Sequence, residues 1–310
     1  MAVTRILVTG GAGFIGSNTI DSLVDHGGFD ISVIDDLSSG KREQLNRAAR
    51  FHHGDLRDRK FVGEVIGREQ PEVVLHLAAQ MDLRRSVADP IFDAEVNLIG
   101  MLNLLEEGRL QGLRRVVFSS TGGAIYGEQE AFPCDEEHPL RPVSPYGVAK
   151  LAAERYLFFY KVQYGIDYLA LRYANVYGPR QDPHGEAGVV AIFCGRMLEG
   201  KPVKIFGDGG QTRDYVYVGD VTRANLGGLL SQVSGALNIG TGTETSVNQL
   251  YQELAGDKFE LKPIYDAARP GEQRRSVISS ARAFHELNWK PEVALADGLA
   301  RTYEYFKSRR

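Results

Sequence analysis

The chain has 310 residues, of which 43% are hydrophobic and 25% are charged, and its formal net charge is −4. This size suits one large globular domain or two modest ones. The negative charge gives no electrostatic reason to expect nucleic-acid binding, and no apolar run is long enough for a membrane span. Two cysteines, Cys134 and Cys194, are read as free buried thiols. Because the first strand pattern leaves no room for a signal peptide, we expect the protein in the cytoplasm.

The first half of the chain alternates between β-rich runs and helical patterns. Strands are expected at 5–9, 31–34, 51–53, 73–77, 116–120 and 168–172, and helices at 14–26, 58–68, 91–110 and 146–164. Such alternation predicts an α/β fold of the Rossmann type, a doubly wound parallel sheet with helices on both faces. Ligands of these sheets bind at the carboxyl ends of the strands.

A glycine-rich turn links the first predicted strand to the first helix. Gly10 would allow the tight turn, Gly13 would let the backbone approach a pyrophosphate, and Gly16 would let the helix pack closely on the strand. The N–H groups at a helix start also attract phosphate. The second strand ends at Asp35 and Asp36, where an acid binds the adenosine ribose and repels a 2′-phosphate. The sequence therefore predicts a dinucleotide site that favours NAD over NADP.

Tyr146 and Lys150 are four residues apart on the predicted helix 146–164, so they share one helix face. Pro145 suits the first helical position. A neighbouring ammonium favours a phenolate, and we expect Lys150 to lower the pKa of Tyr146 and make it a general base. The spacing alone also occurs in surface pairs of no chemical role, and the dinucleotide signal is what favours a catalytic reading.

Glycine and proline become more frequent after residue 175. Short strands are expected at 203–206, 215–218 and 237–239. We expect residues 1–174 to form a cofactor domain that the chain re-enters near 212–240. Residues 175–310 are expected to form a smaller, loop-rich α/β region that binds the substrate.

Five motifs occur in order along the chain. They are Thr9-Gly-Gly-Ala-Gly-Phe-Ile-Gly16, His76-Leu-Ala-Ala79, Ser119-Ser-Thr121, Tyr146-x-x-x-Lys150 and Arg172-Tyr-Ala-Asn-Val-Tyr-Gly-Pro-Arg180. Together they resemble the extended short-chain dehydrogenase/reductase superfamily, and within it the UDP-glucose (UDP-N-acetylglucosamine) 4-epimerases. The resemblance covers nearly the whole chain. It implies that NAD transiently oxidises C4 of a UDP-sugar, and that the helices near 91–110 and 146–164 form a homodimer.

The resemblance also implies roles for individual residues. The implied cofactor-binding residues are Gly10, Gly13, Phe14, Ile15, Gly16, Asp35, Asp36, Ser39, Gly40, Asp55, Leu56, Leu77, Ala78, Ala79, Ser119, Tyr146, Lys150 and Tyr173. The implied substrate-binding residues are Thr121, Tyr146, Asn175, Val189, Val190, Arg213, Arg269, Glu272 and Ser276. Asn97 fits a structural or cofactor-side position. A diphosphate independently favours Arg213 and Arg269, because forked cations bind it well, and both are expected on loops.

Some choices stay open at this level. Tyr146 would be the base and Lys150 its partner, while the hydroxyl that assists them is Thr121 or Ser120. Gly122-Gly123 stand where related 4,6-dehydratases carry two carboxylates, which disfavours dehydration. The small Ser276 would leave space for an N-acetyl group on the sugar.

Other classes of protein are weighed against the epimerase. A UDP-glucuronate epimerase or decarboxylase would want a further cation in the pocket, and a simple reductase would have to exchange NAD during turnover. A non-catalytic NAD-binding protein would not need Tyr146 and Lys150. The spacing of Cys, His and Asp residues resembles no metal site, so no metal is expected.

Overall fold

The computed structural model describes residues 3–183, 188–256, 259–268 and 273–309. The strands are β1 (Thr4–Thr9), β2 (Phe29–Asp35), β3 (Arg50–His53), β4 (Val73–His76), β5 (Arg115–Thr121), β6 (Asp167–Tyr173), β7 (Asn175–Tyr177), β8 (Lys204–Phe206), β9 (Thr212–Tyr217), β10 (Gly235–Ile239), β11 (Glu244–Ser246), β12 (Ile264–Asp266) and β13 (Arg275–Ser276). The helices are α1 (Phe14–His26), α2 (Arg59–Glu69), α3 (Leu83–Ala88), α4 (Pro90–Ala94), α5 (Gly100–Leu110), α6 (Pro145–Tyr164), α7 (Val189–Leu198), α8 (Val218–Leu230), α9 (Val247–Ala255), α10 (Ala281–Leu287) and α11 (Leu295–Lys307). The chain also forms a 3₁₀ turn, η1 (Arg42–Gln44), and a π-helical turn, η2 (Glu95–Ile99).

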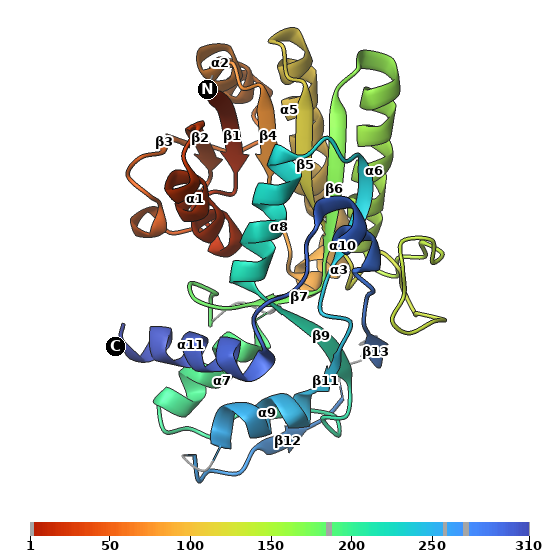
Figure 1. Cartoon of the computed structure of the whole chain (residues 1–310). Coiled ribbons are helices and arrows are strands. Elements are labelled where there is room, and N and C mark those ends of the chain that lie inside the picture. The colour runs from red at the N-terminus through yellow and green to blue at the C-terminus, as the bar shows by residue number, and fades with distance from the viewer. Residues whose placement is uncertain (1–2, 184–187, 257–258, 269–272, 310) are drawn as a thin grey trace.

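A seven-stranded parallel sheet forms the larger part of the molecule (Figure 1). Its strand order is β10-β6-β5-β4-β1-β2-β3. Strand β1 lies between β2 and β4, so the order reverses there and opens a crevice beyond the carboxyl ends of the strands. The predicted Rossmann-type α/β fold is confirmed.

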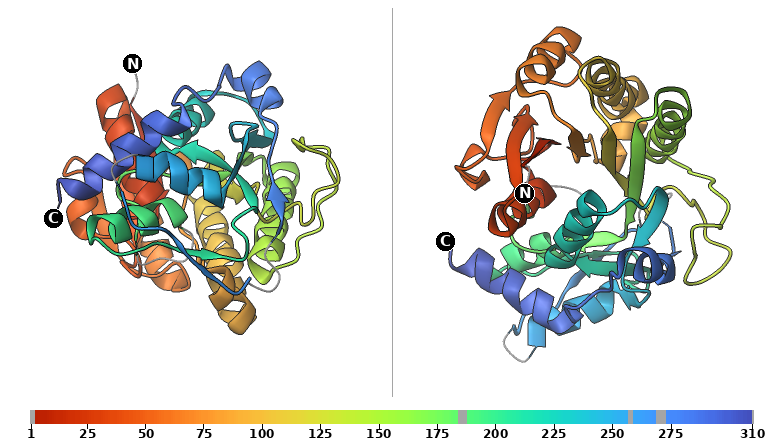
Figure 2. Two further views of the ribbon diagram at one scale, coloured as in Figure 1. Left: turned by 90° about the horizontal axis from the view of Figure 1, so that it is seen from below. Right: turned by 45° about the horizontal axis from the view of Figure 1, so that its top comes forward.

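The side chains of each strand alternate between two apolar cores, one on each face of the sheet. Ile6 and Val8 of β1 pack with Ile20 and Leu23 of α1, whereas Leu7 packs into the core on the opposite face. Helices α1 and α8 cover the first face, and α2, α5 and α6 cover the second (Figure 2). This three-layer arrangement fixes the ends of the strands, where the predicted motifs lie.

A smaller α/β region lies beyond the carboxyl ends of the sheet strands (Figure 1). Its strands pair in the order β11-β9-β13, with β7 also on β9, and β12 pairs with β8. Helices α7, α9 and α11 pack against one another, and Val190, Leu250 and Leu299 share their core. The region is mainly built from the second half of the chain.

The second half also contributes to the main sheet. Strand β10 pairs with β6 at the sheet edge, and α8 packs on α1. The division into a domain of residues 1–174 and one of residues 175–310 stays a prediction.

One expectation about secondary structure is corrected. The segment after residue 175 was expected to be loop-rich, but it contains α7, α8, α9, α10 and α11. Its glycines and prolines are concentrated in the connections, and the helices between them bury their apolar residues against one another. The helix expected over 91–110 is confirmed as an uninterrupted helical run, in which the π turn η2 joins α4 to α5.

Three smaller expectations can be compared with the described part of the chain. Cys134 and Cys194 are free and buried, as predicted. The described residues contain no group of His, Cys, Asp and Glu side chains that could hold a metal ion. None of the helices in these ranges is long and apolar enough to cross a membrane.

Candidate active site

The turn between β1 and α1 has the shape of a phosphate cradle. Gly10 has a φ of 69°, and a Cβ there would lie 2.7 Å from the backbone nitrogen of Ala78. A Cβ at Gly16 would lie 2.1 Å from the carbonyl oxygen of Gly10. Helix α1 begins at Phe14, and its cap residue Gly13 makes no side-chain cap bond. The first N–H groups of the helix therefore face the crevice without a side-chain cap, as anion binding requires.

Asp35 ties the end of β2 to this turn. Its carboxylate accepts hydrogen bonds from the backbone nitrogens of Ala12, at 2.9 Å, and Leu37, at 2.8 Å. Burial raises the pKa of Asp35, while both backbone hydrogen bonds lower it. A Cβ at Gly40 would lie 2.9 Å from an Asp35 carboxylate oxygen, so glycine leaves room beside the carboxylate. The arrangement suits a ribose diol at this strand end.

The remaining residues of this loop are less enclosed. Asp36 is exposed and accepts hydrogen bonds from the backbone and hydroxyl of Ser38, and Ser39 is exposed. They border the cradle from the solvent side. Ala78 donates its backbone N–H to the hydroxyl of Thr9 at 3.2 Å, which holds the segment of Leu77 and Ala79 against β1.

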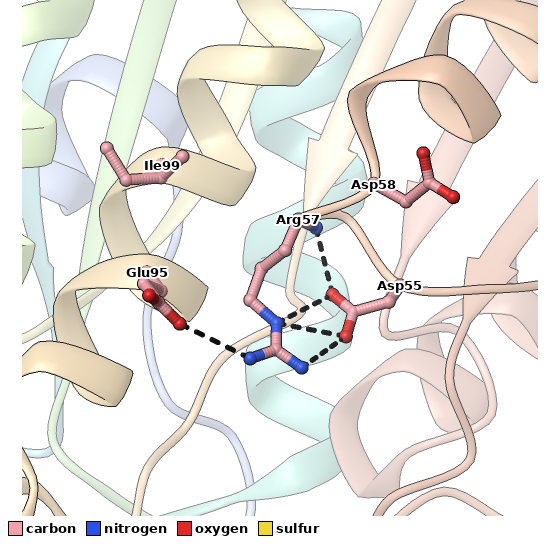
Figure 3. A pocket seen from close by; sticks show the side chains of 5 residues that line it. All are labelled: Asp55, Arg57, Asp58, Glu95 and Ile99. Atoms are coloured by element: carbon pink, nitrogen blue, oxygen red, sulfur yellow. Dashed lines mark hydrogen bonds and ion pairs between the residues drawn. The ribbon is translucent and has the colours of Figure 1, made fainter.

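An open cavity of about 430 Å³ lies between the segment after β3 and the π turn η2, lined by Asp55, Arg57, Asp58, Glu95 and Ile99 (Figure 3). Arg57 lies between two carboxylates: its Nη2 is 2.6 Å from Asp55 and its Nη1 is 3.4 Å from Glu95. Leu56, the neighbour of Asp55, is buried in the core. The cavity therefore presents a hydrogen-bond acceptor held by a cation, as an adenine amino group would require.

The residues of this crevice fit NAD. The close approaches at Gly10 and Gly16, the uncapped helix start and the enclosed carboxylate of Asp35 are the features that a dinucleotide needs. Asn97 lies close to the segment after β4, because its side chain bonds both the N–H and the C=O of Gln80.

The catalytic candidates gather where β5 meets α6. Tyr146 lies at the start of α6, after Pro145 and the capping residue Ser144. The hydroxyl of Thr121, the last residue of β5, is hydrogen-bonded to the Tyr146 side chain. Ser120 lies on the other face of the strand, where its hydroxyl donates to Glu154 at 2.6 Å. Since successive side chains alternate across a strand, only one of the two hydroxyls can face Tyr146, and it is that of Thr121.

Lys150 lies one helical turn beyond Tyr146 and is buried. Its Nζ donates to the carbonyl oxygen of Ser119 at 2.8 Å and stands 4.6 Å from the ring centroid of Phe118. Burial lowers the pKa of Lys150 to about 8, while the charges of Asp93 and Glu154 raise it. The ammonium is therefore held at the strand end and titrates close to neutrality.

The expectation that Lys150 lowers the pKa of Tyr146 is corrected. Burial raises the pKa of the Tyr146 phenol, the charge of Asp93 raises it further, and the hydrogen bond with Thr121 lowers it. The cost of removing a phenolate from water outweighs the favourable neighbours. In the protein alone, Tyr146 is thus a protonated phenol, and a further positive charge is needed to make it a base.

His76 ends β4 beside these residues. Its Nδ1 shares a 2.7 Å hydrogen bond with the Thr9 hydroxyl, and its ring stacks on that of Phe118 at 5.7 Å between centroids. Burial, helped by the charge of Lys150, lowers the pKa of His76 to about 3. His76 is therefore a neutral, hydrogen-bonded histidine of the core.

Tyr173 and Asn175 follow one another at the end of β6 and the start of β7. The Tyr173 hydroxyl is buried and donates to Asn225. A Cβ at Gly123 would lie 3.8 Å from the Asn175 amide oxygen and 3.9 Å from the Thr121 hydroxyl. Asn175 and Thr121 therefore border the same space at the strand end.

Gly122 leaves no space of that kind. A Cβ there would lie 2.6 Å from the Ile278 side chain and 3.2 Å from the carbonyl oxygen of Tyr173. A side chain at Gly122 would therefore require the Ile278 side chain to move and the carbonyl oxygen of Tyr173 to shift by a few tenths of an ångström.

The predicted substrate residues after Asn175 that the structure describes lie on two strands and on α7. Arg213 lies on β9, not on a loop as expected, and donates to the carbonyl oxygen of Thr212 at 2.8 Å. Ser276 is buried and stands beside Arg213 in the parallel pairing of β13 with β9. Val190 is buried in the core of the smaller region, and Val189 is partly buried. The side chain of Val190 is thus committed to packing. Arg269 and Glu272 lie outside the described residues.

Sequence reasoning missed two groups at the site. A Cβ at Gly11 would lie 2.6 Å from Val33, so this glycine is as necessary to the turn as those of the predicted motif. Asp93 is buried, and one of its oxygens accepts hydrogen bonds from Gln80 and Asn97. The glycine run itself could have indicated Gly11, and the i, i+4 spacing of Asp93 and Asn97 was a weak signal for the second group.

The fold and the site define a dinucleotide-dependent enzyme with a Tyr–Lys couple at the end of a central strand. Residues 6–240 match the model of the NAD dependent epimerase/dehydratase family, and the chain belongs to this family.

Individual relatives are similar to this chain over nearly its full length. The chain is 46% identical over 312 residues to the UDP-glucose 4-epimerase of Mycolicibacterium smegmatis, covering 98% of this chain and 99% of the relative. It resembles the structure of Thermotoga maritima UDP-glucose 4-epimerase with UDP-glucose, with a TM-score of 0.95, 49% identity and 99% of both chains covered. The complex of Thermus thermophilus UDP-glucose 4-epimerase with NAD gives a TM-score of 0.94 and 44% identity, covering 99% of this chain and 100% of that one.

Proposed function

We propose that this protein is an NAD-dependent 4-epimerase of UDP-hexoses that interconverts UDP-glucose and UDP-galactose through a transient 4-keto sugar. The observation that carries the proposal is the meeting of Thr121, Tyr146 and Lys150 at the end of β5, beside the phosphate cradle at Gly10. The names of the relatives that match the chain along its length support the choice of substrate.

Tyr146 is the group that moves the proton. It takes the proton of the sugar 4-hydroxyl and later returns it, while Thr121 holds the phenol through their hydrogen bond. NAD, when bound, would supply the hydride acceptor for C4 of the sugar and the positive charge that favours the phenolate. Lys150 is held by Ser119 close to the reacting end of the crevice, where its ammonium adds to this positive field.

The substrate needs a firm hold on its diphosphate and a loose hold on its sugar. We assign the first to Arg213 of β9 together with Arg269, because guanidinium groups bind phosphate oxygens in pairs. We assign the second to the space bordered by Thr121 and Asn175, and we place the sugar 2-position toward Ser276, the neighbour of Arg213. A side chain as small as Ser276 leaves room for a substituent at the sugar 2-position, so UDP-GlcNAc and UDP-GalNAc are further substrates in this proposal.

The residues that follow Thr121 argue against dehydration across C5–C6. That reaction needs carboxylates after the catalytic hydroxyl. Gly122 and Gly123 occupy these positions and carry none. In this proposal, proton transfer at the site is therefore limited to the sugar 4-hydroxyl, which lies beside Tyr146 and Thr121.

The protein is also proposed to form a homodimer through η2, α5 and α6. Large apolar side chains are exposed along these elements and the neighbouring α4: Ile91, Ile99, Leu110, Val148, Tyr156, Phe158, Phe159 and Val162. Ile91 is 73% exposed and Val162 is 70% exposed. Apolar side chains gathered on adjacent helices are typical of an interface with a second copy.

Epimerisation is tested with the purified protein and UDP-glucose, without added NAD, by following the anomeric proton signals in NMR. We expect UDP-galactose to appear, because a reaction without net redox change needs no free cofactor. Tyr146→Phe should abolish turnover while retaining bound NAD. Activity of this variant equal to that of the original chain would remove Tyr146 from the mechanism.

The two neighbouring hydroxyls of β5 provide a matched pair of variants. Thr121→Val should lower kcat by about 10²-fold or more, the usual size of an effect on assisted proton transfer. Ser120→Ala should retain kcat within a few-fold, because its hydroxyl faces Glu154. The reverse result would transfer the catalytic hydroxyl to Ser120.

A further inference from the structure

Asp93 of α4 is a buried carboxylate with one oxygen unpaired. Its side chain is 1% exposed. Oδ1 accepts hydrogen bonds from Gln80 Nε2 and Asn97 Nδ2, both at 3.0 Å. Oδ2 is fully enclosed and has no hydrogen-bond partner among the described residues. Burying an unpaired carboxylate oxygen costs stability, so its retention calls for a reason other than packing.

The paired oxygen fixes the segment that follows β4. Asn97 accepts a hydrogen bond from the backbone nitrogen of Gln80 at 3.0 Å and donates to the Gln80 carbonyl oxygen at 2.9 Å. Asp93 therefore holds both partners of this clamp next to the cofactor-lining residues 77–79. Asn97 lies in the π turn η2, a form of helix that frequently occurs at functional sites.

The carboxylate charge of Asp93 acts on the two catalytic residues, Tyr146 and Lys150. Helices α4 and α6 pack against each other, and Tyr146 and Lys150 lie in the first turns of α6. The charge of Asp93 raises the pKa of both residues. Glu154 also raises the pKa of Lys150, but its carboxylate already binds Arg172 at 2.7 Å.

The other neighbours of Lys150 do not supply a negative charge. His76 is neutral over the working pH range because its pKa lies at about 3, and Tyr146 is a protonated phenol in the protein alone. The carbonyl oxygen of Ser119 accepts a hydrogen bond but carries no formal charge. Of the two carboxylates that act on Lys150 in the described part of the chain, Asp93 is thus the one that no arginine neutralises.

We propose that Asp93 is a positioning residue of the epimerase centre: one carboxylate oxygen holds Gln80 and Asn97, and the other acts as the buried counter-charge that keeps Lys150 protonated. This inference rests on the proposed function, since it assigns a task within the same reaction. Asp93 acts through Lys150 and Tyr146 and is given no contact with the substrate.

The test compares Asp93→Asn with Gln80→Ala in the NAD-loaded protein. Asparagine keeps the size of the side chain and an oxygen for the two amide donors, but it removes the charge. Gln80→Ala loosens the same clamp and leaves the charge in place. For each variant, kcat with saturating UDP-glucose is measured between about pH 5.5 and 10. In Asp93→Asn both limbs of the pH profile should move to lower pH, by about one unit.

The matched control separates charge from structure. Gln80→Ala should lower kcat at every pH without moving either limb. If Asp93→Asn behaves in the same way, Asp93 is only a structural residue and the inference is overturned.

A second readout makes the inference independent of turnover. Tyrosinate absorbance is titrated in the NAD-loaded Asp93→Asn protein and in the chain with Asp93, and in each background the matching Tyr146→Phe spectrum is subtracted. Tyr146 should ionise at lower pH without Asp93, and an unchanged midpoint would contradict the counter-charge role. If the unaltered chain does not epimerise UDP-glucose, the proposed function fails while this titration still decides the role of Asp93.

Discussion

The ammonium of Lys150 stands 5.8 Å from the centroid of the Tyr146 ring and donates a hydrogen bond to the carbonyl oxygen of Ser119. The two residues therefore lie at the end of β5 and are not a solvent-exposed pair on the surface of α6. Burial has opposite effects on their pKa values, lowering that of Lys150 to about 8 and raising that of Tyr146. The couple therefore needs charges from its surroundings.

Turnover should fall as the pH rises through about 8. Below that pH Lys150 is protonated in the folded protein, and above it the ammonium and its favourable field are lost. A profile of kcat against pH with saturating UDP-glucose checks this expectation. Lys150→Met should be weakly active at all pH values, because methionine has no charge to lose. A kcat in the unaltered chain that keeps rising to about pH 10 would contradict a need for the ammonium.

Gly16→Ala should prevent NAD binding. The added Cβ would lie 2.1 Å from the Gly10 carbonyl oxygen, so the turn must open and the helix start must move away from the phosphates. Gly67→Ala is the matched control, since a Cβ at this position of α2 meets nothing within 4 Å. It should retain NAD and gain about 0.5–1 kcal/mol of stability from the better helix former. Bound NAD is measured in both variants after release by denaturation.

His76 should make the protein less stable in acid. Its folded pKa of about 3 lies below the ordinary value of 6.5, so the unfolded chain binds the proton first as the pH falls. Stability from this group is present above pH 6.5 and is lost toward pH 3, at about 1.4 kcal/mol per unit. When the pH is lowered from about 7 to 5, the free energy of unfolding measured in urea should fall by about 2 kcal/mol less for His76→Asn than for the unaltered chain. His285→Asn, at an exposed position, should leave this difference unchanged.

Ser276→Tyr should change which sugars are accepted. Ser276 is buried beside Arg213 in the β13–β9 pairing, so a ring at this position would occupy the space assigned to the sugar 2-substituent. We expect turnover of UDP-GlcNAc to fall by about tenfold or more while that of UDP-glucose is retained within a few-fold. NMR of parallel reactions measures the ratio. Equal losses for both sugars would place Ser276 outside the selectivity of the pocket.

Charges on α6 should separate the proposed dimer. Phe158→Glu combined with Val162→Glu places two carboxylates among exposed apolar side chains, which a second copy would have to bury unpaired. Light scattering should show a dimer for the unaltered chain and a monomer for the double variant. Leu230→Glu, which replaces an equally exposed apolar residue on α8, should stay dimeric. A monomeric unaltered chain would contradict the proposal directly.

The sequence predicted best what depends on neighbours in the chain. The strands of the first half lie within two residues of their expected ends, because each is an apolar run between turn residues. The cradle at Gly10 and the helical spacing of Tyr146 and Lys150 are local patterns of the same kind. The helices of the second half were missed because glycine and proline in their connections dominated the composition.

Contacts between distant segments could not be predicted in this way. Whether Thr121 or Ser120 faces Tyr146 depends on the face that β5 turns toward α6, and one residue of register reverses the answer. The pKa of Tyr146 was predicted with the wrong sign, because the i, i+4 spacing reveals the ammonium but not the depth of burial. The proposed role of Asp93 depends on its hydrogen bond with Gln80, a contact that forms only when α4 packs against the segment after β4 in the folded chain.

The placement of β10 affects how the chain can be made. This strand completes the edge of the parallel sheet beside β6, with β7, α7, β8, β9 and α8 between the two along the chain. During synthesis, all residues up to Ile239 must therefore leave the ribosome before the sheet can be completed. The phosphate cradle near the N-terminus emerges much earlier. Until Ile239 has emerged, the edge of β6 is an open template for other strands. Nascent chains that pause before Ile239 therefore expose the unpaired edge of β6, which a chaperone would have to cover.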